Sequence, residues 1–160
     1  MFIMENVNYF AILREFNQEI LKPINAKCLI VGSMALHTLG VTDAEPKDID
    51  IEVEIASYND RNIFKALALA SGNDFFKKAA TDVESYMENV TWENKPYIFK
   101  WKGVVFNVWV VKEFSHEYIH WERDMYMAKP MSVIKKKMAY KREKDRAFMK
   151  DLIAKLIKLM

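Results

Sequence analysis

The stretch DIDIEVEI, residues 48–55, is the most informative part of this 160-residue chain. Acidic and aliphatic residues alternate with a period of two, which places the acids on one face of a β-strand and the aliphatic side chains on the other. Four carboxylates on one face repel one another, and burying them is costly unless a cation or hydrogen-bond donors compensate. The pattern therefore predicts a strand whose acidic face either meets water or holds a metal ion.

The segment upstream of this strand predicts a strand, a glycine turn and a short helix. Residues 27–31 are mostly apolar and end at Gly32-Ser33, and residues 34–39 are typical of a short helix that Gly40 stops. The single cysteine, Cys28, lies inside the apolar run, so we expect it to pack as a small buried hydrophobic residue.

The rest of the chain predicts a hairpin and several helices. Two β-rich runs, 97–101 and 104–111, flank Lys102-Gly103, which favours a two-residue turn. Apolar spacing and capping residues predict helices at 8–22, at 60–70, in part of 74–90, from Ser132 to about 140, and at 145–159. We therefore expect an α/β (α+β) fold in which a small mixed sheet is flanked by helices and followed by two helices.

Length and composition predict one folded domain over residues 1–160. The chain is 51% hydrophobic, with four glycines and four prolines, and it has no internal repeat or low-complexity linker. Neither a signal sequence nor an apolar stretch of roughly 18–20 residues is visible. We expect a cytoplasmic protein that does not enter membranes.

Charge is divided unevenly along the chain. Residues 129–160 carry eleven Lys or Arg and three acids, whereas residues 1–128 carry thirteen bases and nineteen acids. An acidic body with a basic tail suits a ligand that combines cations and phosphates, such as a metal nucleotide. The basic residues could equally form the solvated faces of the terminal helices.

Asp48 and Asp50 are the candidate metal ligands. Magnesium prefers carboxylate oxygens and keeps sites for water and substrate phosphates, so two carboxylates at i and i+2 of a strand suit phosphoryl transfer. A glycine turn with a serine, here Gly32 and Ser33, offers N–H groups and a hydroxyl to a triphosphate.

The two motifs together resemble the signature of the nucleotidyltransferase superfamily. Val31-Gly32-Ser33 is followed, after fourteen residues, by Asp48-Ile49-Asp50-Ile51. The stretch LIVGSMALHTLG, residues 29–40, is similar to the small bacterial and phage branch that includes abortive-infection and minimal antitoxin-type nucleotidyltransferases, which links it to toxin–antitoxin systems. The resemblance implies a nucleotidyltransferase-like fold and transfer of a nucleotidyl group from a nucleoside triphosphate such as ATP, with Mg²⁺ on the two aspartates.

The same resemblance extends to the basic tail. The branch often carries a lysine, an arginine and a lysine-aspartate pair in its helical C-terminal segment, an order that Lys137, Arg142 and Lys144-Asp145 match. It implies that Lys137 and Arg142 contact the nucleotide phosphates.

Asn107 departs from the superfamily pattern. A further strand in the superfamily supplies a third carboxylate, and the corresponding strand here, residues 104–111, offers Asn107. An amide oxygen can ligate Mg²⁺, but asparagine cannot act as a base and brings no charge, so metal affinity should be weak. Glu52 could compensate from its place further along the acidic strand.

Two hypotheses of different classes follow. The first is a Mg²⁺-dependent nucleotidyltransferase that modifies a hydroxyl of protein, RNA or a small molecule. The second is a catalytically silent domain of the same fold that binds nucleotide or a protein partner.

A literal HExxH at residues 116–120 gives a remote third hypothesis. Two histidines one helical turn apart with a glutamate between them form the zinc site of zincins. The residues that follow are charged, and no third histidine follows them, so we interpret the segment as a surface helix turn after the hairpin.

Overall fold

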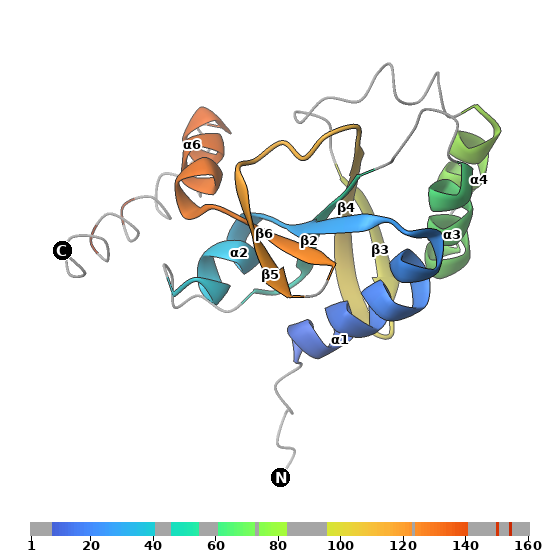
Figure 1. The fold of residues 1–160 in the computed structure, drawn as a ribbon, viewed down its shortest axis with the longest axis horizontal. Coiled ribbons are helices and arrows are strands. Elements are labelled where there is room, and N and C mark those ends of the chain that lie inside the picture. The colour runs from blue at the N-terminus through green and yellow to red at the C-terminus, as the bar shows by residue number, and fades with distance from the viewer. Residues whose placement is uncertain are drawn as a thin grey trace, which may run out of the picture.

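The computed structural model describes residues 8–40, 46–54, 61–72, 74–82, 96–122, 124–140, 150 and 154. These residues form a mixed α/β structure around a six-stranded sheet of order β3-β4-β2-β1-β6-β5 (Figure 1). The expected mixed sheet flanked by helices is confirmed. Within the described residues, no helix has both the length and the apolar character needed to cross a membrane.

The N-terminal helical segment changes its winding twice. Asn8 caps α1 (Tyr9–Phe16) by accepting a hydrogen bond from the Ala11 amide, and a π-helical turn, η1 (Asn17–Leu21), and a 3₁₀ turn, η2 (Lys22–Ile24), continue it. Pro23 lies inside the 3₁₀ turn, and Asn25 ends the segment in the left-handed conformation. The predicted helix over 8–22 is thus present, but it widens into the π-helical turn and then tightens into the 3₁₀ turn near its end.

The sheet centre is built from the segments that the sequence singles out. β1 (Lys27–Ile30) pairs antiparallel with β2 (Ile49–Glu54), and β2 pairs parallel with β4 (Val104–Val111). β4 returns from β3 (Tyr97–Trp101) through a two-residue turn in which Lys102 and Gly103 both have positive φ. The predicted hairpin is confirmed.

Two strands were not expected from the sequence. β5 (Tyr118–Glu122) and β6 (Met125–Ala128) form an antiparallel pair, and β6 joins the sheet by running parallel to β1. The predicted helix turn at residues 116–120 is wrong, because Tyr118 to His120 are extended and pair with β6. The two histidines of HExxH are therefore not one helical turn apart, so the spacing argument for a zincin site is lost.

Much of the buried core lies on one face of the sheet, and Leu29, which pairs with Glu52, extends it to the other face. Alternate residues of β2 and β4, including Ile51, Val53, Phe106 and Val108, are fully buried. Phe16 of α1 contacts the rings of Phe99, Trp101 and Phe106. Cys28 also lies in this core, as expected, and burial raises the pKa of its thiol. This face supplies the apolar burial that stabilises the sheet.

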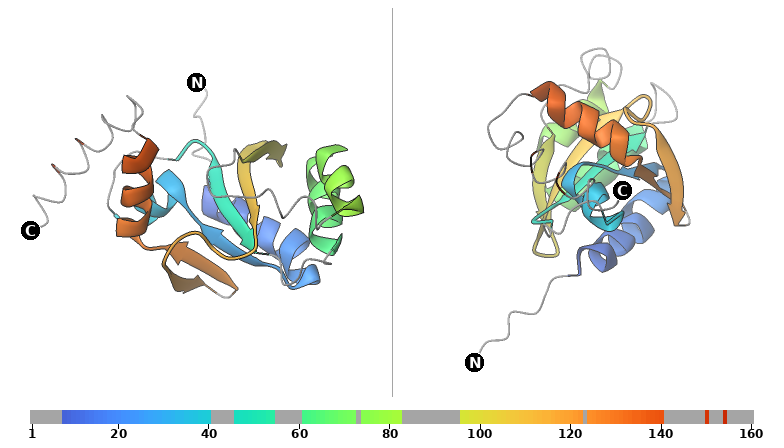
Figure 2. Two further views of the ribbon diagram at one scale, coloured as in Figure 1. Left: turned by 90° about the horizontal axis from the view of Figure 1, so that it is seen from above. Right: turned by 90° about the vertical axis from the view of Figure 1, so that its left-hand side faces the viewer.

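Helices at opposite ends of the sheet complete the fold. The helices α3 (Arg61–Ser71) and α4 (Asp74–Thr81) pack together at one end of the molecule, and α2 (Gly32–Thr38) and α6 (Pro130–Tyr140) lie at the other (Figures 1 and 2). The helix expected from Ser132 begins two residues earlier, at Pro130. The second expected tail helix, 145–159, lies outside the described residues apart from Lys150 and Ala154, which are both helical.

Candidate functional site

The acidic residues of β2 line the sheet face opposite the core. Residue pairing sets Asp50 beside Asn107 and Glu52 beside Trp109 on the neighbouring strand β4. In a parallel pair, residues in register project from the same side of the sheet, so these four side chains share one face. The face is polar where the opposite face is apolar, as the alternation predicts.

Asn107 bridges the two predicted metal ligands. Its side-chain nitrogen Nδ2 donates to Asp48 Oδ2 at 2.8 Å and to Asp50 Oδ1 at 2.7 Å. One nitrogen within reach of both carboxylates means that oxygens of Asp48 and Asp50 converge on a single point. The structure thus places these three predicted site residues side by side.

Gly32 lies directly against this group. It begins α2 with φ of +62°, and a Cβ built at this position would approach Asp50 Oδ2 to 2.8 Å. Both facts require glycine, because other residues seldom adopt positive φ and because any side chain would displace the carboxylate. Ser33 follows as the second residue of α2 and is half-buried.

A second polar group surrounds Glu52, whose side chain is about 1% exposed. Its Oε1 accepts the Ser115 backbone N–H at 2.8 Å, and its Oε2 accepts the Ser115 hydroxyl and lies 3.7 Å from Lys136 Nζ. Glu54, two residues on, accepts the Phe114 backbone N–H at 3.2 Å. Glu52 therefore has partners of its own, which are separate from the contacts of Asn107 with Asp48 and Asp50.

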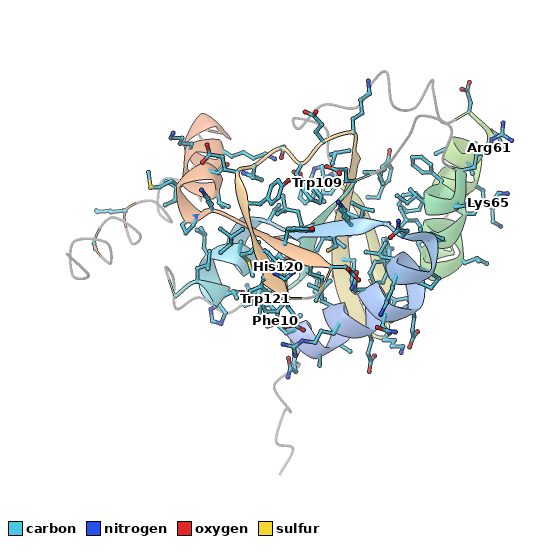
Figure 3. All side chains as sticks on the ribbon, viewed as in Figure 1. Phe10, Arg61, Lys65, Trp109, His120 and Trp121 are labelled. Carbon is cyan, nitrogen blue, oxygen red and sulfur yellow. The ribbon has the colours of Figure 1, made fainter. Side chains whose placement is uncertain are left out.

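Lys136 brings the basic tail onto this face. Its ammonium nitrogen lies 5.9 Å from the centre of the Trp109 ring, which Figure 3 labels, and 3.3 Å from Ser115 Oγ. Burial lowers the pKa of Lys136, while the charge of Glu52 acts in the opposite direction. The pair is consistent with a charged lysine that offsets a buried carboxylate.

His116, the first histidine of the HExxH stretch, is buried next to this group. Its Nδ1 lies 2.8 Å from Ser132 Oγ, and burial, followed by the charge of Lys136, lowers its pKa to about 4. The neutral imidazole is thus the stable form at neutral pH. His120, by contrast, is exposed and packs its ring against Tyr126.

The sequence analysis did not predict Lys136 or Ser115 as site residues. The tail carries three consecutive lysines, 135–137, and Lys136 and Lys137 are three and four residues beyond the buried Val133. Both spacings bring a side chain near the same helix face, so the pattern does not choose between them. Lys137 lies on α6 but its side chain is not described, and Arg142 lies outside the described residues.

A separate groove lies between α3 and α4, away from the predicted residues. It has a volume of about 560 Å³. Figure 3 labels two of its basic lining residues, Arg61 and Lys65, at the end of the molecule that carries α3 and α4. None of the predicted site residues lines this groove.

The carboxylate-amide group has oxygen ligands that suit Mg²⁺. Two carboxylates supply two negative charges, and the amide of Asn107 can offer an oxygen. Among the residues that the structure describes, no three His, Cys, Asp or Glu side chains gather into a metal-binding cluster. A cation at this group would therefore depend on the amide or on substrate phosphates for further ligands.

Comparisons with protein-family models, with curated proteins and with solved structures gave no match. The resemblance to nucleotidyltransferases stays a prediction that rests on the motifs.

Proposed function

We propose that this protein binds a nucleoside triphosphate together with Mg²⁺ at Asp48, Asp50 and Asn107, and transfers its nucleotidyl group to a hydroxyl. The observation that carries the proposal is the convergence of the two aspartates on one point, which Asn107 Nδ2 contacts at 2.7 and 2.8 Å. Carboxylates held this close attract a divalent cation, since their mutual repulsion is relieved when it binds.

Each residue of the group has a role in this proposal. Asp48 and Asp50 would hold Mg²⁺, which supplies positive charge to the triphosphate. Gly32 has no side chain, which leaves room for the Asp50 carboxylate, and its backbone N–H would face a phosphate. The hydroxyl of Ser33, next in the chain, would face the same phosphates.

Asn107 would change its bonding when the cation arrives. Its Nδ2 atom now donates to both carboxylates, and an N–H donor does not ligate a metal. A half-turn of the amide plane would direct Oδ1 toward the aspartates instead. This reversal costs two hydrogen bonds, which supports the expectation of weak affinity for Mg²⁺.

Basic residues of the tail would contact the nucleotide. Lys136 supports this part of the proposal, because α6 brings its ammonium group to the face that carries Asp50 and Asn107. Lys137 and Arg142 stay proposed phosphate contacts on the strength of the motif alone.

The second candidate is a catalytically silent nucleotide-binding domain. Asn107 favours it, because the amide that bridges Asp48 and Asp50 cannot take a proton from an acceptor hydroxyl. In this case the protein would bind nucleotide, or a protein partner, without transfer.

Calorimetric titration with each nucleoside triphosphate, with and without Mg²⁺, tests binding. We expect binding that requires Mg²⁺ and a loss of at least about tenfold in affinity in Asp50→Asn. Affinity should be unchanged in Glu54→Gln, the same carboxylate-to-amide change four residues further along the strand. Binding that is indifferent to Mg²⁺ or to Asp50→Asn would refute the site. Transfer of label from an α-labelled triphosphate to protein or RNA then distinguishes the enzyme from the silent domain.

A further inference from the structure

Ser115 carries a hydroxyl in an unusual setting. The residue is exposed, yet its Oγ donates to Oε2 of the buried Glu52 and accepts a hydrogen bond from Lys136 Nζ at 3.3 Å. Its backbone N–H also donates to Glu52 Oε1 at 2.8 Å, so both carboxylate oxygens are directed at one residue. The hydroxyl is therefore held in a fixed direction on an exposed residue.

This arrangement activates the hydroxyl. A carboxylate that accepts the O–H proton raises the electron density on Oγ and is placed to take that proton during attack on an electrophile. Glu52 is 1% exposed, so water does not compete with Ser115 for its oxygens. Lys136 Nζ lies 3.7 Å from Glu52 Oε2, and its ammonium group can stabilise negative charge that forms on a neighbouring phosphate.

The hydroxyl lies beside the proposed nucleotide site. Glu52 is two residues beyond Asp50 on the same face of β2, a displacement of roughly 7 Å along the strand. Lys136 and Trp109, which is paired with Glu52, flank it on the same face. A nucleotide held at Asp48 and Asp50 would thus have Ser115 as a neighbouring hydroxyl of this chain.

We propose that Ser115 is a self-modification site, which accepts the nucleotidyl group from a nucleoside triphosphate bound at Asp48 and Asp50. The inference rests on the proposed function and names an acceptor for it. Ser115 Oγ forms a bond to the α-phosphorus, the bond between that phosphorus and the α,β-bridging oxygen breaks, and pyrophosphate leaves. The hydroxyl proton passes to Glu52, and the product is a phosphodiester on Ser115.

The test incubates the full chain with Mg²⁺ and ATP, GTP, CTP or UTP in turn, followed by intact-mass measurement and peptide mapping. We expect one triphosphate to add the mass of one nucleotidyl group, which is a nucleoside monophosphate less one water, at Ser115. The addition should disappear in Ser115→Ala and in Asp50→Asn, and should fall at least about tenfold in Glu52→Gln, which keeps the shape but lacks a basic oxygen pair. Ser71→Ala, at the far end of α3, is the matched serine control and should be modified like the parent.

Binding measured on the same samples separates the two proposals. Mg²⁺-dependent nucleotide binding without modification of Ser115, or with modification at another residue, would overturn the inference and leave the proposed function standing. Absence of binding would overturn both. Mapping on the unaltered chain keeps the test decisive even if Ser115→Ala unfolds, because the modified peptide is identified without any variant.

Discussion

The two halves of the acidic row on β2 look alike in sequence and differ in their surroundings. At one end, a neutral amide bridges Asp48 and Asp50. At the other end, Lys136 and the N–H groups of Ser115 and Phe114 engage Glu52 and Glu54. A neutral donor satisfies hydrogen bonds without cancelling charge, whereas a lysine does both. The difference teaches that the two halves suit different roles: the bridged aspartates suit the proposed cation, and the carboxylate beside Lys136 suits the proposed transfer of a proton from Ser115.

The largest effect on stability is expected from removing the lysine of the Glu52–Lys136 ion pair. Lys136→Met leaves the Glu52 carboxylate buried without its cation and should lower the free energy of unfolding by about 3 kcal/mol. The double variant Glu52→Gln with Lys136→Met should recover much of this loss, because it removes the buried charge as well. Urea unfolding at pH 7 measures both. A loss below about 0.5 kcal/mol in the single variant would mean that the pair contributes little.

A change at the other end should have a different signature. Asn107→Asp replaces the bridging donor with a third carboxylate and should cost about 2 kcal/mol without metal, since the repulsion rises and two hydrogen bonds are lost. Millimolar Mg²⁺ should restore most of the stability and bind more tightly than to the parent chain. Thermal unfolding with and without Mg²⁺ checks this.

Asn107→Ser is the control for that variant. It removes the bridge without adding charge, so Mg²⁺ should rescue it less than it rescues Asn107→Asp. If Mg²⁺ restored the stability of Asn107→Asp and Asn107→Ser equally, the cation would lie away from residue 107. The aspartate end of the acidic row would then not differ from the Glu52 end in its attraction for a cation.

A smaller effect is expected at Gly32. Gly32→Ala combines positive φ with a methyl group 2.8 Å from Asp50 Oδ2 and should destabilise the fold by about 1–2 kcal/mol. It should also weaken Mg²⁺-dependent nucleotide binding, because Asp50 must shift. Gly103→Ala, at the hairpin turn, has positive φ with nothing within 4 Å of the added methyl group. Gly103→Ala should therefore lower stability without weakening Mg²⁺-dependent nucleotide binding. An equal loss of binding affinity in Gly32→Ala and Gly103→Ala would contradict the role of Gly32.

The remaining effect concerns pH and the Glu52 end alone. Burial lowers the pKa of His116 from 6.5 to about 4, so the unfolded chain binds a proton between these values that the folded chain does not. Stability should therefore fall as pH drops through this window, by roughly 1 kcal/mol per pH unit. His116→Gln should remove this part of the slope, and His120→Gln, at the exposed histidine, should keep it. Urea unfolding between pH 7 and 4.5 measures the slopes.

The alternation in β2 predicted the sheet centre because it reports burial directly. Ile49, Ile51 and Val53 are completely buried, and the acids between them occupy the other face. The hairpin was predictable from Lys102-Gly103 for a similar local reason, since the turn residues are adjacent in the chain. Both features depend on residues that are close together in the sequence, and periodic sequence patterns report on such local relations.

Strands β5 and β6 were missed because they depend on distant partners. Met125 to Ala128 forms a short apolar run that becomes a strand by pairing with β1, and Tyr118 to Glu122 is a largely exposed edge without clear alternation. In the candidate site, Asp48, Asp50, Asn107 and Gly32 followed from the motifs. Lys136 and Ser115 did not, because the path of the 112–117 loop and the rotation of α6 are set by tertiary packing.

The place of β1 in the sheet has a consequence for how the molecule folds. Its residue Cys28 pairs with Val53 on one side and with Met125 on the other. The first neighbour is close in the chain and the second is far away, and contacts of large sequence separation slow folding. During synthesis, β1 and β2 can pair long before β6 leaves the ribosome, so the open edge of β1 must wait for the segment that also delivers Lys136. The Glu52 end of the acidic row would then be the last part of the sheet face to form.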